Sequence, residues 1–407
     1  MRAVVLCATL AAALLPPRAG AQSLSLSEAD MLARLSAESP RVRAIRASTD
    51  VVRAEALAAR RWPNPRITVD RESVAGVTEY LTMIGQVLPV TGRRGLEIQS
   101  AAALVDASSA RSGDALRCAR ADARTAYAQL VAAQTRERAL TDARDRLREL
   151  VAVLVRRENA GDAAGFDRLR AEREVSDLDA DLAAIATERA RAQSAIAGFF
   201  AEPVAPSRIV AAVEPTAAAA LPSIDALVER SLTTRGELLA LQKERDAARL
   251  AMDAADRRRL PEPELIAGTK SSTLGGGDIG SVVTVQVSVP LFDRGKPERA
   301  LAEARARQAD AQAQLLRATL RADIAALHAA VLERRDTAMR YRTTAVNGAS
   351  EIERVARVSY DAGERGILEL LDAYHAGSTA RVRQAALDLA AREAEIALDF
   401  VSGWEIP

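Results

Sequence analysis

The sequence has 407 residues, of which 49% are hydrophobic and 27% charged, and its net charge is +1. This near-neutral balance gives no electrostatic basis for binding nucleic acid, so we expect no nucleic-acid partner. Only 3% of the residues are aromatic. A chain rich in alanine and arginine with so few large side chains is typical of long helices packed side by side.

The first 21 residues are typical of a secretory signal peptide. One early positive charge precedes an apolar run at 3–15, and the small residues 19–21 fit a cleavage site. Cys7 precedes that site, so we expect no lipid-modified cysteine at the mature N-terminus. No later segment reaches about 18 consecutive apolar residues, which predicts no transmembrane helix. We therefore expect an exported protein whose membrane crossing, if it has one, is made by strands.

The first half of the mature chain predicts a helix, two strands, a long helix, a turn and a second long helix. The strands are expected at 66–73 and 80–89, joined by a short turn that contains glycine. From about 92 to 160 the apolar residues recur at coiled-coil steps, which predicts one helix of ~70 residues and on the order of 100 Å. Residues 166–198 then return antiparallel to it.

The second half repeats this order about two hundred residues later. RRWPNPRITV matches RRLPEPELIA, QVLPVTGRRG matches VSVPLFDRGK, and ENAGDAAGFDRLRA matches YDAGERGILELLDA. Three matches in the same order indicate an internal duplication. The expected first repeat, 22–200, contains a strand pair at 66–89 and a helical hairpin at 92–200. A Pro/Ala-rich connector follows at 201–222. The expected second repeat, 223–407, contains strands at 264–272 and 280–290 (the pair 264–290) and a helical hairpin at 294–402.

The last strand has one apolar and one polar face. Val283, Val285 and Val287 alternate with polar residues until Pro290, which has no N–H to donate, ends the ladder. An open sheet edge is not tolerated in hydrocarbon, so membrane strands must close into a barrel. Single-chain barrels have at least about eight strands, whereas three copies of this chain would supply about twelve. The alternative is a soluble four-stranded sheet that caps a helical bundle.

The duplicated, exported chain resembles the TolC-like outer membrane efflux protein family (outer membrane factor). The resemblance rests on the WPNP lead, the strand exits and the Ala-Gly turns, and it covers essentially the whole mature chain. QVLPVTGRRG is most similar to the heavy-metal (cobalt-zinc-cadmium type) resistance branch. The fold that this implies is mainly α with a β-barrel part: a trimeric 12-stranded outer-membrane β-barrel that continues into a long periplasmic α-helical coiled-coil barrel.

The resemblance also implies a gate at the periplasmic tip. The family pattern Y-x-x-G-x-R-x-x-x-[DE]-x-x-D is matched here by Tyr360, Gly363, Arg365, Glu369 and Asp372. The two acids are three residues apart, so one side of a helix can present both to the lumen. In a trimer they would form an acidic ring that attracts cations. The first acid is Glu rather than Asp, which affects the expected width of the aperture.

Other tip residues have implied roles. Tyr360 and Arg365 resemble the gate latch, with Asp167 as their expected partner. The tip turns at Gly161 and Gly363 are where the resemblance implies that a periplasmic adaptor docks, and each glycine is expected to be left-handed at a helix end. The alternative for all of these charges is that they are solvated groups at helix ends.

No enzyme activity, cofactor or metal site is expected. His328 and His375 lie far apart in the sequence and lack metal-ligand spacing. His328 occupies the repeat position of Tyr127 and is predicted to be a packing residue. Cys118 is the only cysteine after the signal peptide, and we predict that it is a small core residue of a long helix.

The function implied is the outer-membrane channel of a tripartite efflux system. It would be a passive, gated exit duct in the outer membrane with a periplasmic extension, working as a homotrimer with a periplasmic adaptor (membrane fusion) protein and an inner-membrane RND-type pump. Heavy-metal cations are the cargo that the resemblance favours. The alternative is a periplasmic coiled-coil scaffold or adaptor without a pore, which would need no strand with outward valines. A diffusion porin would have more strands and no helix of ~70 residues.

Overall fold

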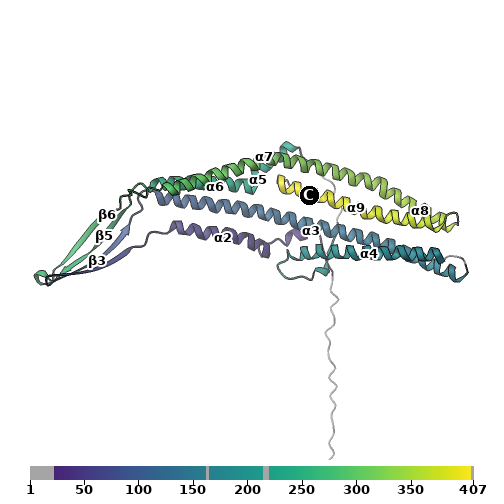
Figure 1. The fold of residues 1–407 in the computed structure, drawn as a ribbon, viewed down its shortest axis with the longest axis horizontal. Helices are drawn as coiled ribbons and strands as arrows, with labels where there is room; N and C mark the ends of the chain where they lie inside the picture. Colours follow the sequence, from purple (N-terminus) through teal and green to yellow (C-terminus); the bar gives the residue numbers. More distant parts are fainter. Residues whose placement is uncertain (1–22, 162–164, 214–219, 405–407) are drawn as a thin grey trace, which may run out of the picture.

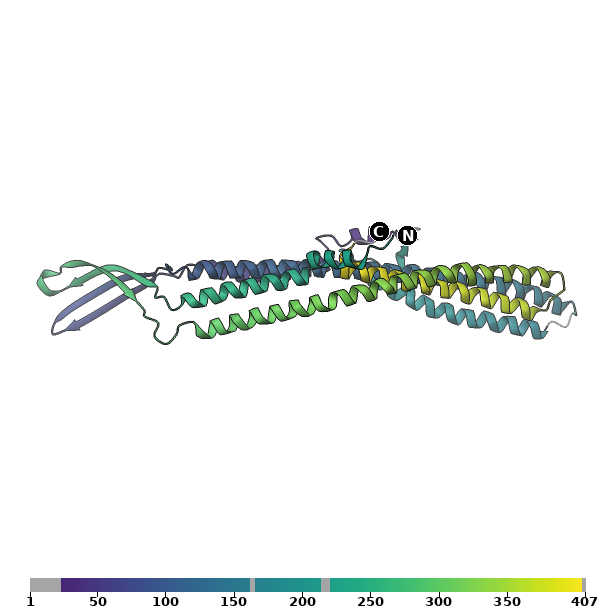
Figure 2. The ribbon, with the colours of Figure 1, turned by 90° about the horizontal axis from the view of Figure 1, so that it is seen from above.

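The computed structural model describes residues 23–161, 165–213 and 220–404. The predicted signal peptide, residues 1–21, lies outside this part. The molecule is long, with a strand hairpin pair at one end, the tips of helical hairpins at the other and the C-terminus near the middle (Figures 1 and 2). The described part is mainly helical, as the sequence predicts.

Four antiparallel strands make up the sheet at one end. They are β2 (Arg66–Val74), β3 (Val77–Val87), β5 (Pro263–Ser272) and β6 (Ile279–Val287), and they pair in the order β2-β3-β5-β6. The sheet is therefore open within one chain, with β2 and β6 as its two edges. A short 3₁₀ turn, Leu274–Gly276, lies in the second hairpin.

The two faces of the sheet differ in polarity. Residues directly opposite each other in an antiparallel pair share a face. Because Ile84 also pairs with Ala267, the pairs Ile67–Ile84 and Ala267–Val283 lie on the same face, which carries large exposed hydrophobic side chains with between 43% and 73% of their area accessible. This apolar face consists of Ile67, Val69, Ile84, Leu265, Ala267, Val283, Val285 and Val287, and the opposite, charged face carries Arg66, Asp70, Glu72, Glu79, Glu264 and Lys270.

Next to the sheet, four helices form a curved layer. Helix α2 (Pro40–Arg60) packs on α3 (Arg93–Asn159), α3 on α6 (Gly236–Arg257), and α6 on α7 (Lys296–Tyr341). The two edges of this upper layer are therefore α2 and α7. Because its buried positions are largely alanine, the helix axes can approach closely.

Farther from the sheet, a second layer continues the first. Helix α4 (Gly165–Ala197) packs on α3, α3 on α9 (Ile367–Ser402), and α9 on α8 (Asn347–Asp361). A π-helical segment, Arg342–Val346, joins α7 to α8. The edges of this lower layer are α4 on one side and α8 on the other.

Short elements surround the middle of the molecule. Strand β1 (Leu24–Leu26) pairs in parallel with β4 (Ile209–Ala211), which follows a 3₁₀ turn, Pro206–Arg208. Helix α1 (Glu28–Ala33) has a capping box at Ser27, and α5 (Ile224–Thr234) precedes α6. The connector at 201–222, which the sequence identifies only as a Pro/Ala-rich segment, thus contributes a strand.

The duplication is visible in how the connector is held. The Tyr127 hydroxyl donates a hydrogen bond to the carbonyl of Ala212. His328, at the repeat position of Tyr127, places Nε2 3.2 Å from the carbonyl oxygen of Pro222. Each copy therefore uses a ring in its long helix to hold one end of the connector, which agrees with a packing role for His328.

The prediction for Cys118 is wrong. Its side chain is exposed on α3, whereas the next residue, Ala119, is buried. The helical rotation of about 100° between neighbours turns Cys118 away from the packed side. No helix in the described part has the length and hydropathy needed to span a bilayer.

Candidate functional site

The residues predicted for the gate lie at the end of the molecule farthest from the sheet. There α3 turns into α4 and α8 turns into α9 (Figure 1). A hydrophobic cluster holds the two hairpins together below their tips, and Tyr360 packs against it. Its buried members include Leu154, Leu178, Ile367, Leu370, Leu371 and Tyr374.

Both tip glycines have the left-handed conformation that the sequence predicts. Gly161 has φ +91° and Gly363 has φ +76°. The amide of Gly363 donates to the carbonyl of Tyr360 at 3.0 Å, and that of Gly161 donates to the carbonyl of Glu158 at 3.0 Å. Such bonds satisfy carbonyls left unpaired at a helix C-terminus. Both helix ends, at Gly161 and at Gly363, are therefore closed by a backbone hydrogen bond.

Tyr360 contacts the other hairpin through an arginine. The Arg157 Nη1 donates to the Tyr360 hydroxyl at 3.3 Å, and its guanidinium carbon lies 5.5 Å from the centre of the ring. A cation over an aromatic face is stabilised by the ring quadrupole. This contact joins α3 to the end of α8, and sequence reasoning missed Arg157 because nothing local distinguishes it from the other arginines of its helix.

The expected partner of Tyr360 and Arg365 lies elsewhere. Asp167 is in the first turn of α4, and the described part contains no contact between it and either residue. Because α4 and α8 are opposite edges of the lower layer, these residues do not meet within one chain. Their pairing stays a prediction.

The two acids of the predicted ring share one exposed side of α9. Glu369 and Asp372 are exposed, whereas their neighbours Ile367, Leu370 and Leu371 are buried. Glu369 also lies in the first turn of α9, near the N-cap residue Gly366. A carboxylate there is favoured by the helix dipole, which gives the position of Glu369 a structural reason.

A buried carboxylate above the tip was not predicted. Glu353 of α8 is 7% exposed and accepts hydrogen bonds from Arg146 of α3 at 3.0 Å and from Arg381 of α9 at 2.7 Å. It occupies the same stripe as the buried residues Ala349 and Ala356. A charge in an apolar stripe was the signal that could have identified it, because such a position requires a buried partner.

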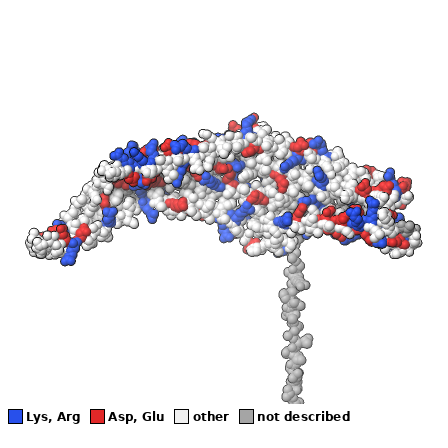
Figure 3. Space-filling view, in the orientation of Figure 1, with Lys and Arg blue, Asp and Glu red and all other residues white. Residues whose placement is uncertain are grey.

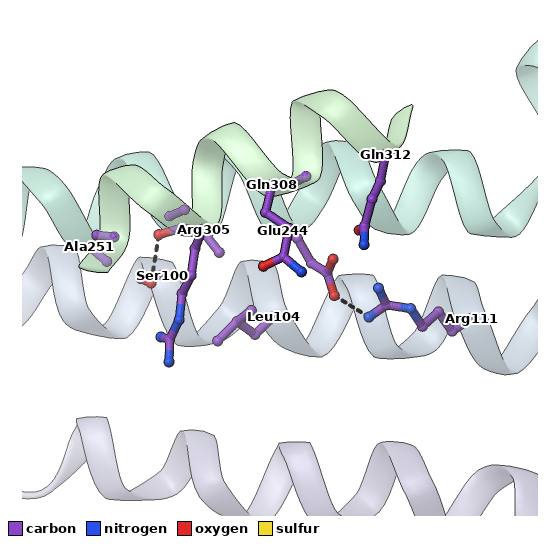
Figure 4. Close-up of a pocket in the computed structure, with 12 residues that line it drawn as sticks. Ser100, Leu104, Arg111, Glu244, Ala251, Arg305, Gln308 and Gln312 are labelled. Atoms are coloured by element: carbon purple, nitrogen blue, oxygen red, sulfur yellow. Dashed lines mark hydrogen bonds and ion pairs between the residues drawn. The ribbon is translucent and has the colours of Figure 1, made fainter. Parts of the chain in front are cut away.

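The upper layer contains a groove of about 510 Å³ between α3, α6 and α7 (Figure 4). Its walls are alanines of α6 and α7 with Leu104, and its polar groups are Gln308, Gln312, Arg305 and the ion pair of Arg111 with Glu244. Ser100 donates to the backbone of Ala247 at 2.8 Å. The Ser100 hydroxyl is thus bonded to the backbone of α6.

Within the described residues, no group of three or more His, Cys, Asp or Glu side chains is placed to hold a metal ion. His375 is exposed, with Nδ1 3.9 Å from a carboxylate oxygen of Glu174. His328 lies on a different helix near the connector. The structure thus does not bring the two histidines together.

Comparisons with known proteins agree with this architecture. Residues 227–403 match the family described as "Outer membrane efflux protein". No curated protein matches the sequence. Three solved structures with a similar fold each align with 92% of this chain. A membrane protein from Pseudomonas aeruginosa has a TM-score of 0.77 and 19% identity, with 93% of its own chain covered. The outer membrane protein VceC from Vibrio cholerae has a TM-score of 0.73, 17% identity and 96% of its chain covered, and the CmeC outer membrane channel from Campylobacter jejuni has a TM-score of 0.74, 14% identity and 85% of its chain covered.

Proposed function

We propose that three copies of this chain form the outer-membrane channel of an efflux system. Each copy would supply four strands to a twelve-stranded β-barrel and its helices to a periplasmic duct. The observation that carries the proposal is the sheet, which has two open edges and an apolar face that no other described segment covers. Such a sheet is a liability in water, whereas a closed barrel in lipid satisfies both its edges and its apolar face.

The open edges of the helical layers support the same assembly. On the upper layer, α2 exposes Val51 and Leu57, and α7 exposes Leu315. On the lower layer, exposed apolar side chains again lie on both edges. They are Phe166 and Leu169 on α4, and Ile352, Val355 and Val358 on α8. Joining the α2 and α4 edge of one copy to the α7 and α8 edge of the next would bury these side chains and continue the wall into a ring.

The same ring would complete the gate. Asp167 of one copy would face Arg365 of its neighbour, because they lie on opposite edges of the lower layer. Glu369 and Asp372 from the exposed side of α9 would together supply six carboxylates to one constriction. Rings of acidic side chains select for cations in channels.

A periplasmic adaptor, docked at the tip turns, and an inner-membrane RND-type pump are the partners that we propose. This end of the system would be passive, and the pump would supply the energy. Heavy-metal cations are the cargo favoured by the resemblance of QVLPVTGRRG to the heavy-metal resistance branch, and the proposed acidic ring has the charge to admit them.

The test is to extract the protein from the cell envelope in detergent, determine the mass of the complex and record currents across planar bilayers. Three chains per complex, with a single-channel conductance that divalent cations reduce, is the expected result. A monomer or dimer in the soluble envelope fraction, without conductance, would contradict the proposal and favour the periplasmic scaffold.

A further inference from the structure

The junction between helices and strands is far more basic than the rest of the chain. Residues 60–66, 90–97, 256–262 and 291–299 together hold eleven Lys and Arg but only five Asp and Glu, in a chain whose total net charge is +1. At the other end of the strands, residues 70–79 and 270–279 hold two cations and four acids. Charge therefore changes sign along the sheet.

The four segments meet at one level of the molecule. Arg94 donates to the carbonyl of Arg61 at 3.5 Å and lies over the ring of Trp62, which joins the start of α3 to the end of α2. Arg93 donates to Glu262 at 2.9 Å, which joins α3 to the start of β5. Figure 3 shows the Lys and Arg side chains gathered where α6 and α7 meet the strands.

The acids of the junction are already occupied. Asp256 pairs with Arg299, and Arg258 donates to Glu298 at 2.7 Å with Asp293 3.7 Å away. Six exposed cations remain for which no acidic partner is found among the described residues. We call this set the collar: Arg60, Arg61, Arg257, Arg259, Arg294 and Lys296.

Helix dipoles account for only part of the collar. Arg60 and Arg257 lie in the last turns of α2 and α6, where a cation is favoured. Arg294 and Lys296 flank Gly295, the N-cap of α7, where the dipole disfavours positive charge. The helix dipole therefore does not account for these two cations.

Apolar side chains accompany these cations. Trp62 is 59% exposed, Leu260 43%, Leu291 62% and Phe292 99%. Aromatic rings and cations side by side are typical of the level where lipid headgroups meet hydrocarbon. Arginine also matches phosphate oxygens with two parallel N–H donors.

We propose that the collar binds the headgroups of anionic phospholipids in the leaflet that faces the helices, and so fixes the depth of the sheet in the membrane. The inference rests on the proposed function, since it needs the strands to cross a bilayer. It adds a lipid class and the residues that select it. Each cation near an anionic membrane surface should favour the anionic lipid about fivefold at low ionic strength, and salt should weaken this preference.

The experiment substitutes two collar cations, Arg294 and Lys296, and uses Trp62, which lies at the same junction, as the reporter. The sequence has two tryptophans, so a Trp404→Phe background leaves Trp62 as the only one. The full-length protein is reconstituted in vesicles of ordinary phosphatidylcholine. An increasing fraction of that lipid is replaced either by phosphatidylglycerol with brominated chains or by phosphatidylcholine with brominated chains. The quenching of Trp62 fluorescence is measured in each series. The variant Arg294→Gln with Lys296→Gln is compared with the control Arg120→Gln with Arg317→Gln. The control removes two exposed arginines from the middle of α3 and α7.

The expected result is half-maximal quenching at a severalfold lower fraction of brominated phosphatidylglycerol than of brominated phosphatidylcholine. The preference should fall in the collar variant and in high salt, and it should remain in the control. Equal quenching by both lipids in the unsubstituted collar would overturn the inference, as would no quenching by either. Conductance of the same vesicles reports separately on the channel, so either result can be told apart from a failure of the proposed function.

Discussion

Glu353 of α8 occupies the space that a Cβ atom on Gly377 of α9 would fill. Its carboxylate accepts hydrogen bonds from Arg146 at 3.0 Å and Arg381 at 2.7 Å. One glutamate over one glycine therefore ties α8 to both α9 and α3 just below the π-helical segment. Since α8 is otherwise an edge helix, this contact determines how closely it follows α9 to the tip.

Replacing Gly377 with alanine should displace Glu353 from its two arginines. We expect a loss of about 2 kcal/mol in the free energy of unfolding, because the arginines are partly exposed and keep some solvation. Gly348→Ala is the matched control: this helical glycine of α8 has open space for a Cβ, so the change should stabilise by about 0.5–1 kcal/mol. Denaturant unfolding measures both, and similar effects at the two sites would show that the Glu353 contact is not close-packed.

Arg157 and Tyr360 should act as one unit in holding the tip closed. Tyr360→Phe removes the hydroxyl that accepts from Arg157, and Arg157→Gln removes the donor and the cation over the ring. Each variant should raise the conductance of the closed channel, and the double variant should add little to Arg157→Gln alone. Single-channel recording tests this, and strictly additive effects would mean that the two residues act independently.

The acidic ring should set the sensitivity to divalent cations. Glu369→Gln with Asp372→Asn keeps the side-chain volumes but removes both charges from the exposed side of α9. The concentration of Mg²⁺ that halves the current should then rise on the order of tenfold, because ligand charge governs affinity for hard cations. Glu364→Gln, an exposed acid in the turn before α9, is the control and should change the block much less. Unchanged block in the double variant would remove these acids from the constriction.

The two faces of β6 should differ in their tolerance of charge. Val285 pairs with Leu265 on the apolar face, whereas Thr284 pairs with Ile266 on the opposite face, which carries Glu264 and Lys270 nearby. Val285→Asp should make the free energy of membrane insertion less favourable by roughly 2 kcal/mol, since a charge would face lipid. Thr284→Asp should assemble normally. Assembly is measured as the yield of heat-modifiable oligomer in the membrane fraction, and the reverse order of yields would mean that lipid contacts the other face.

The tip should lose stability at high pH. Burial raises the pKa of the Tyr374 phenol above its ordinary value of 10.0, since the charged form is poorly solvated in the hydrophobic cluster. The folded state then binds its proton more tightly than the unfolded state. This contribution is present below about pH 10 and is lost as pH rises through the folded pKa. The denaturant concentration at the unfolding midpoint should fall between about pH 9 and 11, and it should fall less in the Tyr374→Phe variant. An equal fall in both proteins would mean that other groups cause the loss of stability.

The ends of the long helix α3 could be predicted closely because local sequence signals mark both of them. The coiled-coil steps predicted a helix from about 92 to 160, and α3 runs from Arg93 to Asn159. Left-handed glycines, Gly92 with φ +77° and Gly161 with φ +91°, stand at its two ends. Glycine adopts positive φ without steric cost, so its position in the sequence is a strong indication of where a helix ends.

The strand boundaries were less accurate. Strand β3 begins at Val77, three residues before the predicted start, since the hairpin turn consists of only Ala75 and Gly76. Ala75 has φ +52°, a conformation that alanine rarely adopts, so composition gave no reason to expect so tight a turn. The π-helical segment and the pairing of β1 with β4 were also missed. The strand pairing joins Leu24 to Ile209, and no local pattern encodes so distant a contact.

Of the candidate site, the sequence predicted the tip turns and the shared side of Glu369 and Asp372, which follow from helical spacing. It did not predict that Arg157 contacts Tyr360. Such a contact depends on the register between two helices about two hundred residues apart, and no local pattern encodes that register.

The parallel pairing of β1 with β4 places a constraint on how the chain reaches its native state. Leu24 pairs with Ile209, so the earliest described strand has no partner until more than 180 later residues have been made. Contacts of such long sequence separation form slowly, because the loop between them must first be ordered. The segment from Leu24 to Leu26 should therefore stay accessible to proteases and chaperones until the first helical hairpin has folded, and would be the last part of the first repeat to become protected.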